Sequence, residues 1–423
     1  MNPILPPQFY IPDVEARQWE DGNVYLYGSM DKCGNDEYCS KQYFVFRSKN
    51  MKEWSVYRNS FTSASVHDKE SRNVALYAPD CVKIGEKYCL FYCQEDRGEG
   101  VAFCDDPCGP FADARAIVPA DKDGIDPAVL VDDDGSVYYF WGQARAKGGK
   151  LNVKTGEIIP GTLTEDILTE SEHGFHEGIS IRKRNGIYYL VYADISRGHP
   201  TCLGYAMSDK PLGPYVKKGI IIDNTGSDPE NWNNHGSIAE INGKWYVFYH
   251  RASHNSKFSR RVCVEPIFFN PDGTIDEVIM TTQGIEEPLD CFKKLEAGRA
   301  CALSGKCYVD DYSDGVQFFE YIMNIHGGDR LTYRYITIPD QPSGIVLEAS
   351  SQNYGATVKV YLDENENDIL TEIHIEETEG KYDFRKFFAE IQRKKIAGVH
   401  SLHLKMEGNK GTLACLKSIY FLK

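Results

Sequence analysis

The sequence contains no Cys-x-x-Cys pair and no apolar stretch that approaches 18 residues. The first absence weakens the case for a structural zinc site, and because of the second no membrane-spanning helix is expected. The chain opens with Met-Asn-Pro-Ile-Leu-Pro-Pro, which lacks the basic start and apolar core of a secretory leader. We therefore expect a cytoplasmic protein, and a secreted one only if a leader has been removed.

Positive charge is also scarce. The 423 residues include 47 Lys and Arg against 62 Asp and Glu, which gives a net charge of −15. Nucleic-acid phosphates and anionic membrane surfaces would repel such a chain, so we expect neither as a partner, whereas a neutral ligand fits. The 13 cysteines are odd in number and scattered, and their simplest interpretation is buried free thiols in a reducing cytoplasm.

What the sequence does contain is aromatic residues and a repeat. Aromatic residues make up 12% of the chain, including 27 Tyr and 20 Phe, and they favour strands. Five similar strand-forming phrases recur, and their first glycines lie 63, 50, 51 and 57 residues apart. The phrases are Gly22–Tyr27, Gly85–Tyr92, Gly135–Trp141, Gly186–Tyr192 and Gly243–Tyr249.

Each repeat indicates a small antiparallel sheet. Asn185-Gly186 and Asn242-Gly243 stand between strand-forming runs and are strong signals for two-residue hairpin turns. A unit of roughly 50 residues holds about four strands, which is the size of a propeller blade. We therefore predict an all-β protein in which residues 1–290 form a five-bladed β-propeller.

The character of the chain changes near Gly298. Short alternating strands separated by polar turns follow, and they predict a β-sandwich (jelly-roll) domain over residues 298–423. Within it, Phe384 to Ile396 could form a helix, but we interpret this segment as an extended connection.

A polar residue precedes each repeated phrase: Asp13, Asp80, Asp126, Glu177 and His235. Three of the acids lie nine residues before their glycine, so equivalent strands should bring them to similar depth near the central axis. Two carboxyls meeting there can hydrolyse a glycosidic bond, one by donating a proton to the leaving oxygen and the other by activating water. A third acid would raise the pKa of the donor by repulsion. Asp80 lies five residues before its glycine and so departs from the nine-residue spacing, and we expect it to be structural.

Less specific interpretations compete with these. Asp126 stands in an Asp-Pro pair and, taken alone, would be a turn residue, as we expect for Asp132–Asp134. A lone His235 would be a histidine satisfied by hydrogen bonds in the core. Trp141 and Trp232 could stack on sugar faces or belong to the core.

Five short motifs occur in order at the spacing of the repeats: Ile11-Pro-Asp13, Ala78-Pro-Asp80, Ile125-Asp-Pro-Ala128, His176-Glu-Gly178 and His235-Gly-Ser237. Together they resemble glycoside hydrolase family 43, whose members have a five-bladed propeller and invert the anomeric configuration. The resemblance covers about residues 1–290, and it implies that this is the catalytic domain. It implies Asp13 as general base, Asp126 as the residue that orients and tunes the pKa, and Glu177 as general acid.

The resemblance also implies contacts with sugar and a metal. The family often places an arginine near the sugar, which makes Arg261 the candidate, with Arg260 as the competitor; Arg261 could instead be a surface charge. Trp141 is, from its residue type alone, the candidate for a stacking contact. His235 matches a histidine that in many members binds a central, structural calcium directly or through water. Histidine is, however, an unusual ligand for such a hard cation, so the core interpretation stays open. No organic cofactor is expected.

The carboxy-terminal part resembles carbohydrate-binding module family 6, through Gly328–Tyr335 and Gly398–Leu404. Binding members of that family usually hold a sugar between two aromatic rings, one from a tryptophan near the end of the module. This chain has no tryptophan after Trp245. The domain could therefore bind sugar or serve only as a structural partner of the propeller.

These resemblances imply an inverting, exo-acting glycosidase. It would remove terminal α-L-arabinofuranosyl or β-xylosyl residues from arabinoxylan or xylo-oligosaccharides, and the propeller–sandwich combination favours arabinofuranosidase over β-xylosidase. The alternative is a non-catalytic, lectin-like propeller. Loss of Asp13, Asp126 or Glu177 would have favoured that alternative, and all three are present.

Overall fold

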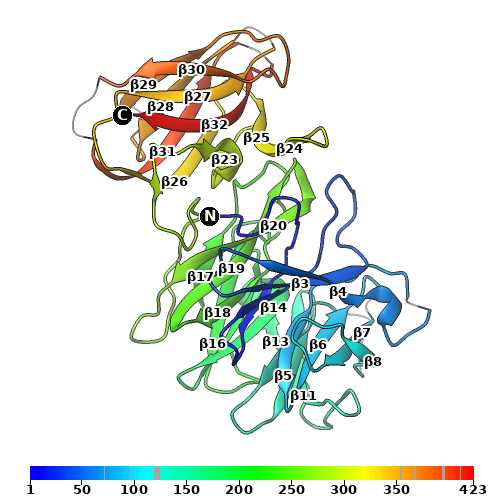
Figure 1. Cartoon of the computed structure of the whole chain (residues 1–423). Coiled ribbons are helices and arrows are strands. Elements are labelled where there is room, and N and C mark those ends of the chain that lie inside the picture. The colour runs from blue at the N-terminus through cyan, green and yellow to red at the C-terminus, as the bar shows by residue number, and fades with distance from the viewer. Residues whose placement is uncertain are drawn as a thin grey trace.

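The computed structural model describes residues 1–70, 72–96, 98–118, 124–352, 355–365, 368–392, 396–409 and 411–423. These residues form two domains built from strands, with the amino-terminal domain in the lower part of Figure 1 and the carboxy-terminal domain above it. The described helical structure is limited to α1 (Glu170–His173) and two 3-10 turns, η1 (Ser63–Ser65) and η2 (Ala297–Arg299). The predicted all-β class, a five-bladed propeller followed by a β-sandwich, is confirmed.

Five antiparallel sheets follow one another along the first domain, made of β1–β4, β5–β8, β9–β13, β14–β17 and β18–β20. The first strands of these sheets contact one another, β5 with β9, β9 with β14, β14 with β18 and β18 with β1, so they lie at the centre of the ring. The strands are β1 (Glu15–Gln18), β2 (Val24–Tyr27), β3 (Gln42–Ser48), β4 (Ser55–Thr62), β5 (Asp80–Ile84), β6 (Lys87–Cys93), β7 (Glu99–Cys104), β8 (Ala112–Ala116), β9 (Ala128–Val131), β10 (Val137–Trp141), β11 (Arg145–Asn152), β12 (Glu157–Ile158), β13 (Thr164–Thr169), β14 (Phe175–Arg184), β15 (Ile187–Asp194), β16 (Cys202–Ser208), β17 (Val216–Asp223), β18 (Ser237–Ile241), β19 (Lys244–Ser253) and β20 (Ser256–Ile267).

The hairpins inside the blades follow from local turn chemistry. Asn185 and Gly186 separate β14 from β15 with φ angles of 51° and 79°. Asn242 and Gly243 separate β18 from β19 with φ angles of 51° and 76°. Positive φ at both central residues is what a tight hairpin turn needs, and Asn-Gly reaches it at low cost. Both predicted hairpins are confirmed.

The repeated aromatic phrases form the packing between blades. Each interface between neighbouring blades holds its own cluster of buried apolar side chains, including the interface between the last blade and the first. Every phrase contributes at least one fully buried tyrosine, among them Tyr25, Tyr92, Tyr139, Tyr192 and Tyr249. Because a tyrosine buries a large apolar area, these positions stabilise the ring as a whole.

The ring is completed by the two ends of the propeller sequence. The fifth sheet has three described strands, and the amino-terminal segment covers its free edge. The Ile4 N–H donates to the Val262 carbonyl at 3.1 Å, and the Val264 N–H donates to the side-chain oxygen of Asn2 at 2.9 Å. The segment therefore occupies backbone groups that an exposed edge strand would offer to other chains.

The second domain is a sandwich of two six-stranded sheets around one apolar core. One sheet has the order β21-β26-β31-β28-β29 with β23 beside β26, and the other has the order β24-β25-β32-β27-β30 with β22 beside β32. The strands are β21 (Leu289–Asp290), β22 (Leu295–Glu296), β23 (Ala302–Ser304), β24 (Tyr308–Ser313), β25 (Phe318–Ile325), β26 (Arg330–Ile338), β27 (Gly344–Ser350), β28 (Ala356–Leu362), β29 (Ile369–Ile375), β30 (Arg385–Glu390), β31 (Gly398–Glu407) and β32 (Ala414–Leu422).

Two details of the sandwich refine its sequence-based outline. β21 and β22 pair with β26 and β32, so the sandwich sheets begin at Leu289, ahead of the boundary expected at Gly298. The segment Phe384 to Ile396 contains a strand, Arg385–Glu390, and residues 393–395 lie outside the described part. This strand is extended, as predicted, but it pairs with β27 as part of a sheet and is not a plain connection.

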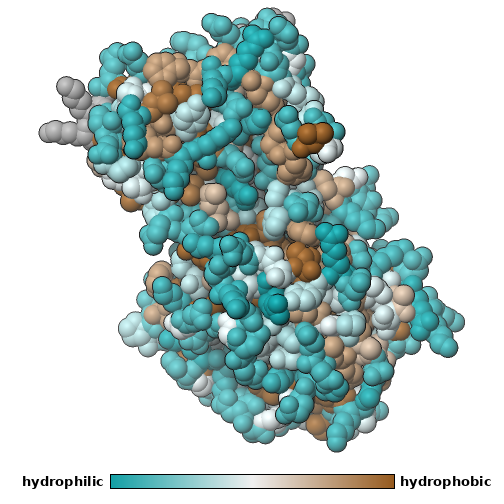
Figure 2. All heavy atoms as spheres, viewed as in Figure 1, coloured by the Kyte–Doolittle hydropathy of each residue, from teal (hydrophilic) through white to brown (hydrophobic). Residues whose placement is uncertain are grey.

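The two domains meet through charged and aromatic side chains. Arg261 of β20 forms a buried ion pair with Glu320 of β25, and the Arg261 guanidinium lies 5.8 Å from the centre of the Tyr10 ring. Figure 2 shows the domains as two lobes whose visible face is mainly hydrophilic. In the described part of the chain, no helix is both long enough and apolar enough to cross a membrane.

Candidate active site

A cavity of about 230 Å³ opens where the innermost strands of the propeller begin. Asp13, Asp126 and His235 lie two residues before β1, β9 and β18, and Glu177 lies near the start of β14. The repeat therefore delivers these four side chains to one place, as the equal offsets of Asp13, Asp126 and Glu177 indicated. The lining consists of Asp13, Tyr38, Cys39, Tyr77, Ala78, Ile125, Asp126, Gln143, Glu177, Asn233, His235 and Arg260.

The backbone at these positions is specialised. Asp13 and Asp126 have φ angles of 56° and 55°, in the left-handed region that costs energy for residues other than glycine. Such strain is concentrated at functional sites. Gly178 has a φ of 73°, and a Cβ there would come within 2.8 Å of the His235 ring. Glycine is therefore required beside Glu177, both for its conformation and to make room for the histidine.

Asp13 is buried and surrounded by donors. Its Oδ2 accepts from Ser29 Oγ at 2.5 Å, and its Oδ1 accepts from Arg260 Nη1 at 3.0 Å. Nδ1 of His250 and Nδ1 of His235 lie 3.6 and 3.7 Å from the same Oδ1. Burial alone would raise the pKa of Asp13, but the Arg260 guanidinium above all, with the Ser29 hydroxyl that donates to the carboxylate, holds it below its usual value. The carboxyl is thus kept ionised and able to accept a proton.

His250 itself is fully buried. Burial and the neighbouring Arg260 lower the pKa of His250 to about 3, so its ring is neutral at ordinary pH. Its Nε2 lies 2.9 Å from the Asn233 carbonyl, which fixes the ring in place. The positive charge facing Asp13 therefore comes from Arg260.

Glu177 has a different environment from Asp13. Its side chain is half-buried, at a point where β14 departs from regular pairing with β15. Gln143 Nε2 donates to its Oε2 at 2.8 Å, and Asn233 Nδ2 donates to its Oε1 at 3.4 Å. Asp126 lies near the same ring nitrogen of His235 as Asp13, with its Oδ2 3.9 Å from Nδ1. One pocket thus combines a carboxyl paired with an arginine and a carboxyl that accepts hydrogen bonds from two neutral amides.

Two predicted sugar-contacting residues lie elsewhere. Arg261 does not line the pocket, because it faces the sandwich and pairs with Glu320. Trp141 is 2% exposed and packs beside Tyr139 in the core between the second and third blades. These positions do not support sugar contacts by Arg261 or Trp141. Trp232, in contrast, is 43% exposed and directly precedes the pocket residue Asn233.

Asp80 has the structural role that its irregular offset indicated. It is fully buried and pairs with Arg17 of β1 at 2.6 Å. Its carboxylate also accepts the Val129 N–H at 2.8 Å, and these contacts join the first three blades.

Several pocket residues were not predicted from the sequence. Tyr38 and Cys39 come from the β2–β3 connection, Gln143 from the β10–β11 turn and Asn233 from the β17–β18 connection. They lie outside the repeated phrases, so periodicity could not find them. Arg260 was the competitor to Arg261, and strand alternation places one of these neighbours in the pocket and the other on the opposite face.

The surroundings of His235 do not make a calcium cage on their own. Calcium prefers six to eight oxygen ligands at about 2.3–2.6 Å. The carboxylates of Asp13 and Asp126 lie 3.7 and 3.9 Å from His235 Nδ1, and Asp13 is already occupied by Ser29 and Arg260. No step of the chemistry is therefore assigned to a metal.

Replacing Arg260 with methionine should destabilise the protein by about 3–5 kcal/mol at neutral pH, because Asp13 and Asp31 would remain buried without their cation. The lowered pKa of Asp13 means that its ionised form stabilises the fold above the ordinary carboxyl pKa, and that this stabilisation is lost as the pH falls through the lowered pKa. The difference between wild type and variant should therefore shrink towards acidic pH. Urea unfolding at neutral and acidic pH measures it.

The matched control for this experiment is Arg58→Met. Arg58 is exposed, and surface substitutions usually change stability by less than about 0.5 kcal/mol. An Arg260→Met effect of equal size at both pH values would show that Arg260 does not act through the two carboxylates.

Comparison with known proteins agrees with this geometry. Residues 1–275 match the model of glycosyl hydrolases family 43, and residues 304–423 match that of carbohydrate binding module family 6. The chain belongs to glycosyl hydrolase family 43, and it is a glycosidase.

Individual relatives cover most of the chain. A xylosidase/arabinosidase of Thermoclostridium stercorarium is 32% identical over 345 residues, which cover 71% of this chain and 72% of the relative. An arabinoxylan arabinofuranohydrolase of Paenibacillus polymyxa is 24% identical over 447 residues, which cover 92% of this chain and 69% of the relative.

Two solved structures share the fold. A family 43 arabinoxylan arabinofuranohydrolase from Bacillus subtilis, in complex with cellotetraose, has a TM-score of 0.56 at 23% identity and covers 100% of this chain and 97% of its own. A β-xylosidase/α-arabinofuranosidase from a compost microbial metagenome, in complex with xylotriose and described as a calcium-free form, has a TM-score of 0.57 at 26% identity. It covers 66% of this chain and 97% of its own.

Proposed function

We propose that this protein is an inverting exo-glycosidase that removes terminal pentose, α-L-arabinofuranosyl or β-xylosyl, from arabinoxylan or xylo-oligosaccharides. The observation that carries the proposal is that Asp13, Asp126 and Glu177 line one and the same pocket. Its volume of about 230 Å³ suits one terminal sugar better than a polysaccharide that passes through. The relatives named as xylosidase/arabinosidase and arabinoxylan arabinofuranohydrolase support the pentose.

The roles of the carboxyls follow from their surroundings. Asp13, which Arg260 and Ser29 keep ionised, takes the proton of the attacking water as general base. Glu177, which accepts hydrogen bonds from the amides of Gln143 and Asn233, donates a proton to the leaving oxygen. Asp126, which lies in the third blade, orients Asp13 and Glu177. Arg260, rather than Arg261, is the arginine that reaches the sugar.

A panel of nitrophenyl glycosides tests this function directly. We expect hydrolysis of α-L-arabinofuranoside or β-D-xyloside, with arabinofuranoside preferred, and no comparable hydrolysis of hexosides. Proton NMR of the first product formed should show the inverted anomer. A lectin-like propeller would bind the sugars without releasing nitrophenol, and a retained anomer would exclude the proposed mechanism.

The sandwich is expected to bind xylan weakly or not at all. Sugar affinity in such domains depends on exposed aromatic faces, and the late tryptophan is absent. Tyr333 is fully buried, with its hydroxyl bonded to the Ala297 carbonyl, whereas Tyr335 and Tyr420 are half-buried. Affinity electrophoresis of residues 289–423 in soluble xylan measures this binding. Clear retardation of the domain would contradict the expectation.

We further propose that any calcium at His235 is held mainly by water. The described surroundings supply one imidazole and two distant carboxylates, so the ion would bind weakly. Treatment with EGTA should then lower the Tm by less than about 2 °C, a shift that corresponds to a small change in stability. A fall of 10 °C that millimolar calcium reverses would show instead a tight structural site.

A further inference from the structure

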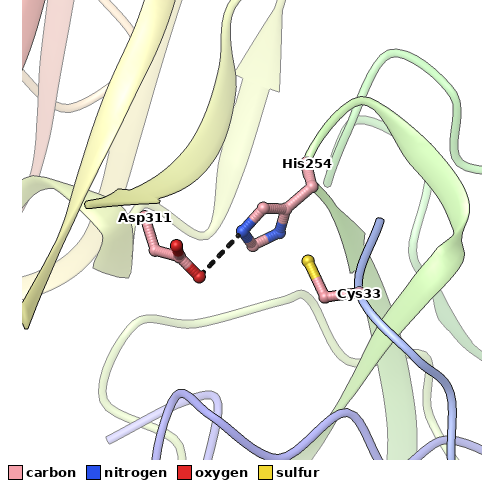
Figure 3. Close-up of side chains that lie close together, drawn as sticks. All are labelled: Cys33, His254 and Asp311. Atoms are coloured by element: carbon pink, nitrogen blue, oxygen red, sulfur yellow. Dashed lines mark hydrogen bonds and ion pairs between the residues drawn. The ribbon is translucent and has the colours of Figure 1, made fainter. Parts of the chain in front are cut away.

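A second cluster of reactive side chains lies outside the active site, where the two domains meet. Figure 3 shows Cys33 from the β2–β3 connection, His254 from the turn between β19 and β20, and Asp311 from β24 of the sandwich. One ligand atom from each residue lies within 4.8 Å of the others. The three residues are far apart in the sequence and belong to both domains, so only the tertiary structure brings them together.

Hydrogen bonds fix the orientation of the His254 ring. The Ser253 hydroxyl donates to the Ser259 carbonyl at 2.9 Å, which leaves its oxygen free to accept from His254 Nδ1, also at 2.9 Å. A proton on Nδ1 leaves the lone pair of Nε2 directed at the cluster. Metal-binding histidines are usually held by such a bond from the second ring nitrogen.

The other ring nitrogen faces a carboxylate. His254 Nε2 lies 3.3 Å from Asp311 Oδ2 and 3.3 Å from the Tyr10 hydroxyl, which itself donates to Asp311 at 3.4 Å. A single phenolic proton cannot satisfy both the nitrogen and the carboxylate. A positive charge between His254 and Asp311, supplied by a proton or by a metal ion, would satisfy both groups.

Cys33 adds a thiol to this pair. It is the exposed cysteine of the chain, since Cys104 is half-buried and the other eleven are buried. Its Sγ lies with the ligand atoms of His254 and Asp311, all within 4.8 Å of one another, so the thiol is placed to bind a metal ion together with them.

We propose that Cys33, His254 and Asp311 form a zinc site that joins the propeller to the sandwich. Thiolate, imidazole and carboxylate together are the ligand types that zinc takes in tetrahedral sites. Asp310, whose Oδ1 lies 3.7 Å from His254 Nε2, or a water molecule completes the fourth position. The cluster lines a surface pocket of about 550 Å³, through which an ion enters.

The geometry requires a small closing movement. Bonds of about 2.0–2.3 Å around a tetrahedral zinc separate its ligand atoms by roughly 3.4–3.6 Å, less than the 4.8 Å that bounds this cluster. Cys33 lies in a connection without regular strands, so its thiol can move by about 1 Å. The ligand atoms must draw together before they can bind zinc, so we expect micromolar affinity.

The site also connects to the active-site pocket. The β2–β3 connection that carries Cys33 carries Asp31, which pairs with Arg260, and Tyr38, which lines the cavity. Tyr38 packs edge-on against Phe258, whose ring centre is 4.6 Å away in the strand that follows His254. Zinc would thus hold one wall of the pocket against the sandwich.

Zinc binding by the full chain tests the proposal. After chelator treatment, titration with zinc chloride should show one micromolar site, and Co²⁺ should give a thiolate-to-cobalt charge-transfer band. Cys33→Ser should abolish the band and weaken zinc binding at least tenfold, and Asp311→Asn should weaken it similarly. Cys104→Ser is the matched control and should behave as wild type.

Two further outcomes decide the proposal. The proposal is wrong if the wild type shows no saturable zinc binding at about 100 μM, or if the wild type and Cys33→Ser bind zinc equally well. In that case a proton lies between His254 and Asp311. Zinc should also raise the Tm of the wild type by about 2–4 °C and that of Asp311→Asn by much less. If zinc raises the Tm of the wild type and of Asp311→Asn equally, Asp311 is not a ligand and zinc does not join the two domains.

Discussion

Glu177→Gln is expected to lower kcat by about 100- to 10,000-fold on substrates with a poor leaving group, because an amide cannot donate the proton that the departing oxygen needs. The half-buried side chain accepts hydrogen bonds from Gln143 and Asn233, and a glutamine of the same shape should leave the fold intact. Steady-state kinetics on xylo-oligosaccharides and on nitrophenyl pentosides measure the effect.

The leaving group distinguishes an acid from other roles. Nitrophenolate departs with little protonation, so the Glu177→Gln variant should lose much less activity on nitrophenyl pentosides than on oligosaccharides. Glu172→Gln, which changes an exposed glutamate of α1, is the control and should retain wild-type rates. If Glu177→Gln keeps wild-type activity on oligosaccharides, Glu177 is not the acid.

Asp13→Asn is expected to lower kcat by about 100- to 10,000-fold on every substrate, whatever its leaving group, because the attacking water must lose its proton in each case. Asparagine also places an amide where Arg260 and Ser29 now meet a carboxylate, so the Tm should be measured alongside the kinetics. Asp209→Asn, at an exposed position, is the control.

The two variants together test the assignment of roles. If Asp13→Asn loses activity on oligosaccharides but keeps it on nitrophenyl substrates, Asp13 is the acid, and the proposed roles of Asp13 and Glu177 are reversed. A fully folded Asp13→Asn protein with wild-type kcat would remove Asp13 from the mechanism.

Much of the site was predictable because the chain repeats itself. Asp13, Asp126 and Glu177 each precede their glycine by nine residues, and His235 precedes its glycine by eight. In a ring of equivalent blades, equal offsets place side chains at equal depth beside one axis, so the sequence alone indicated that they meet. The Asn-Gly turns and buried tyrosines were likewise local signals, since each depends on neighbouring residues.

The partners of these residues were not predictable in the same way. Asp13 depends for its charge on Arg260, which lies 247 residues away. Neighbouring Arg260 and Arg261 are chemically identical, and only the face of β20 that each occupies sends one to Asp13 and the other to Glu320. No local pattern records which face of a strand meets which domain.

The sequence by itself determined the all-β class, the five blades and the meeting of three carboxyls and a histidine, because periodic patterns and turn chemistry act over short distances. The tertiary structure alone decided that Arg260 holds Asp13 ionised, that Trp141 is core, and that Cys33 and His254 face Asp311 across the domain boundary. These contacts arise where separate blades and domains pack together, and packing between distant segments leaves no regular spacing in the chain.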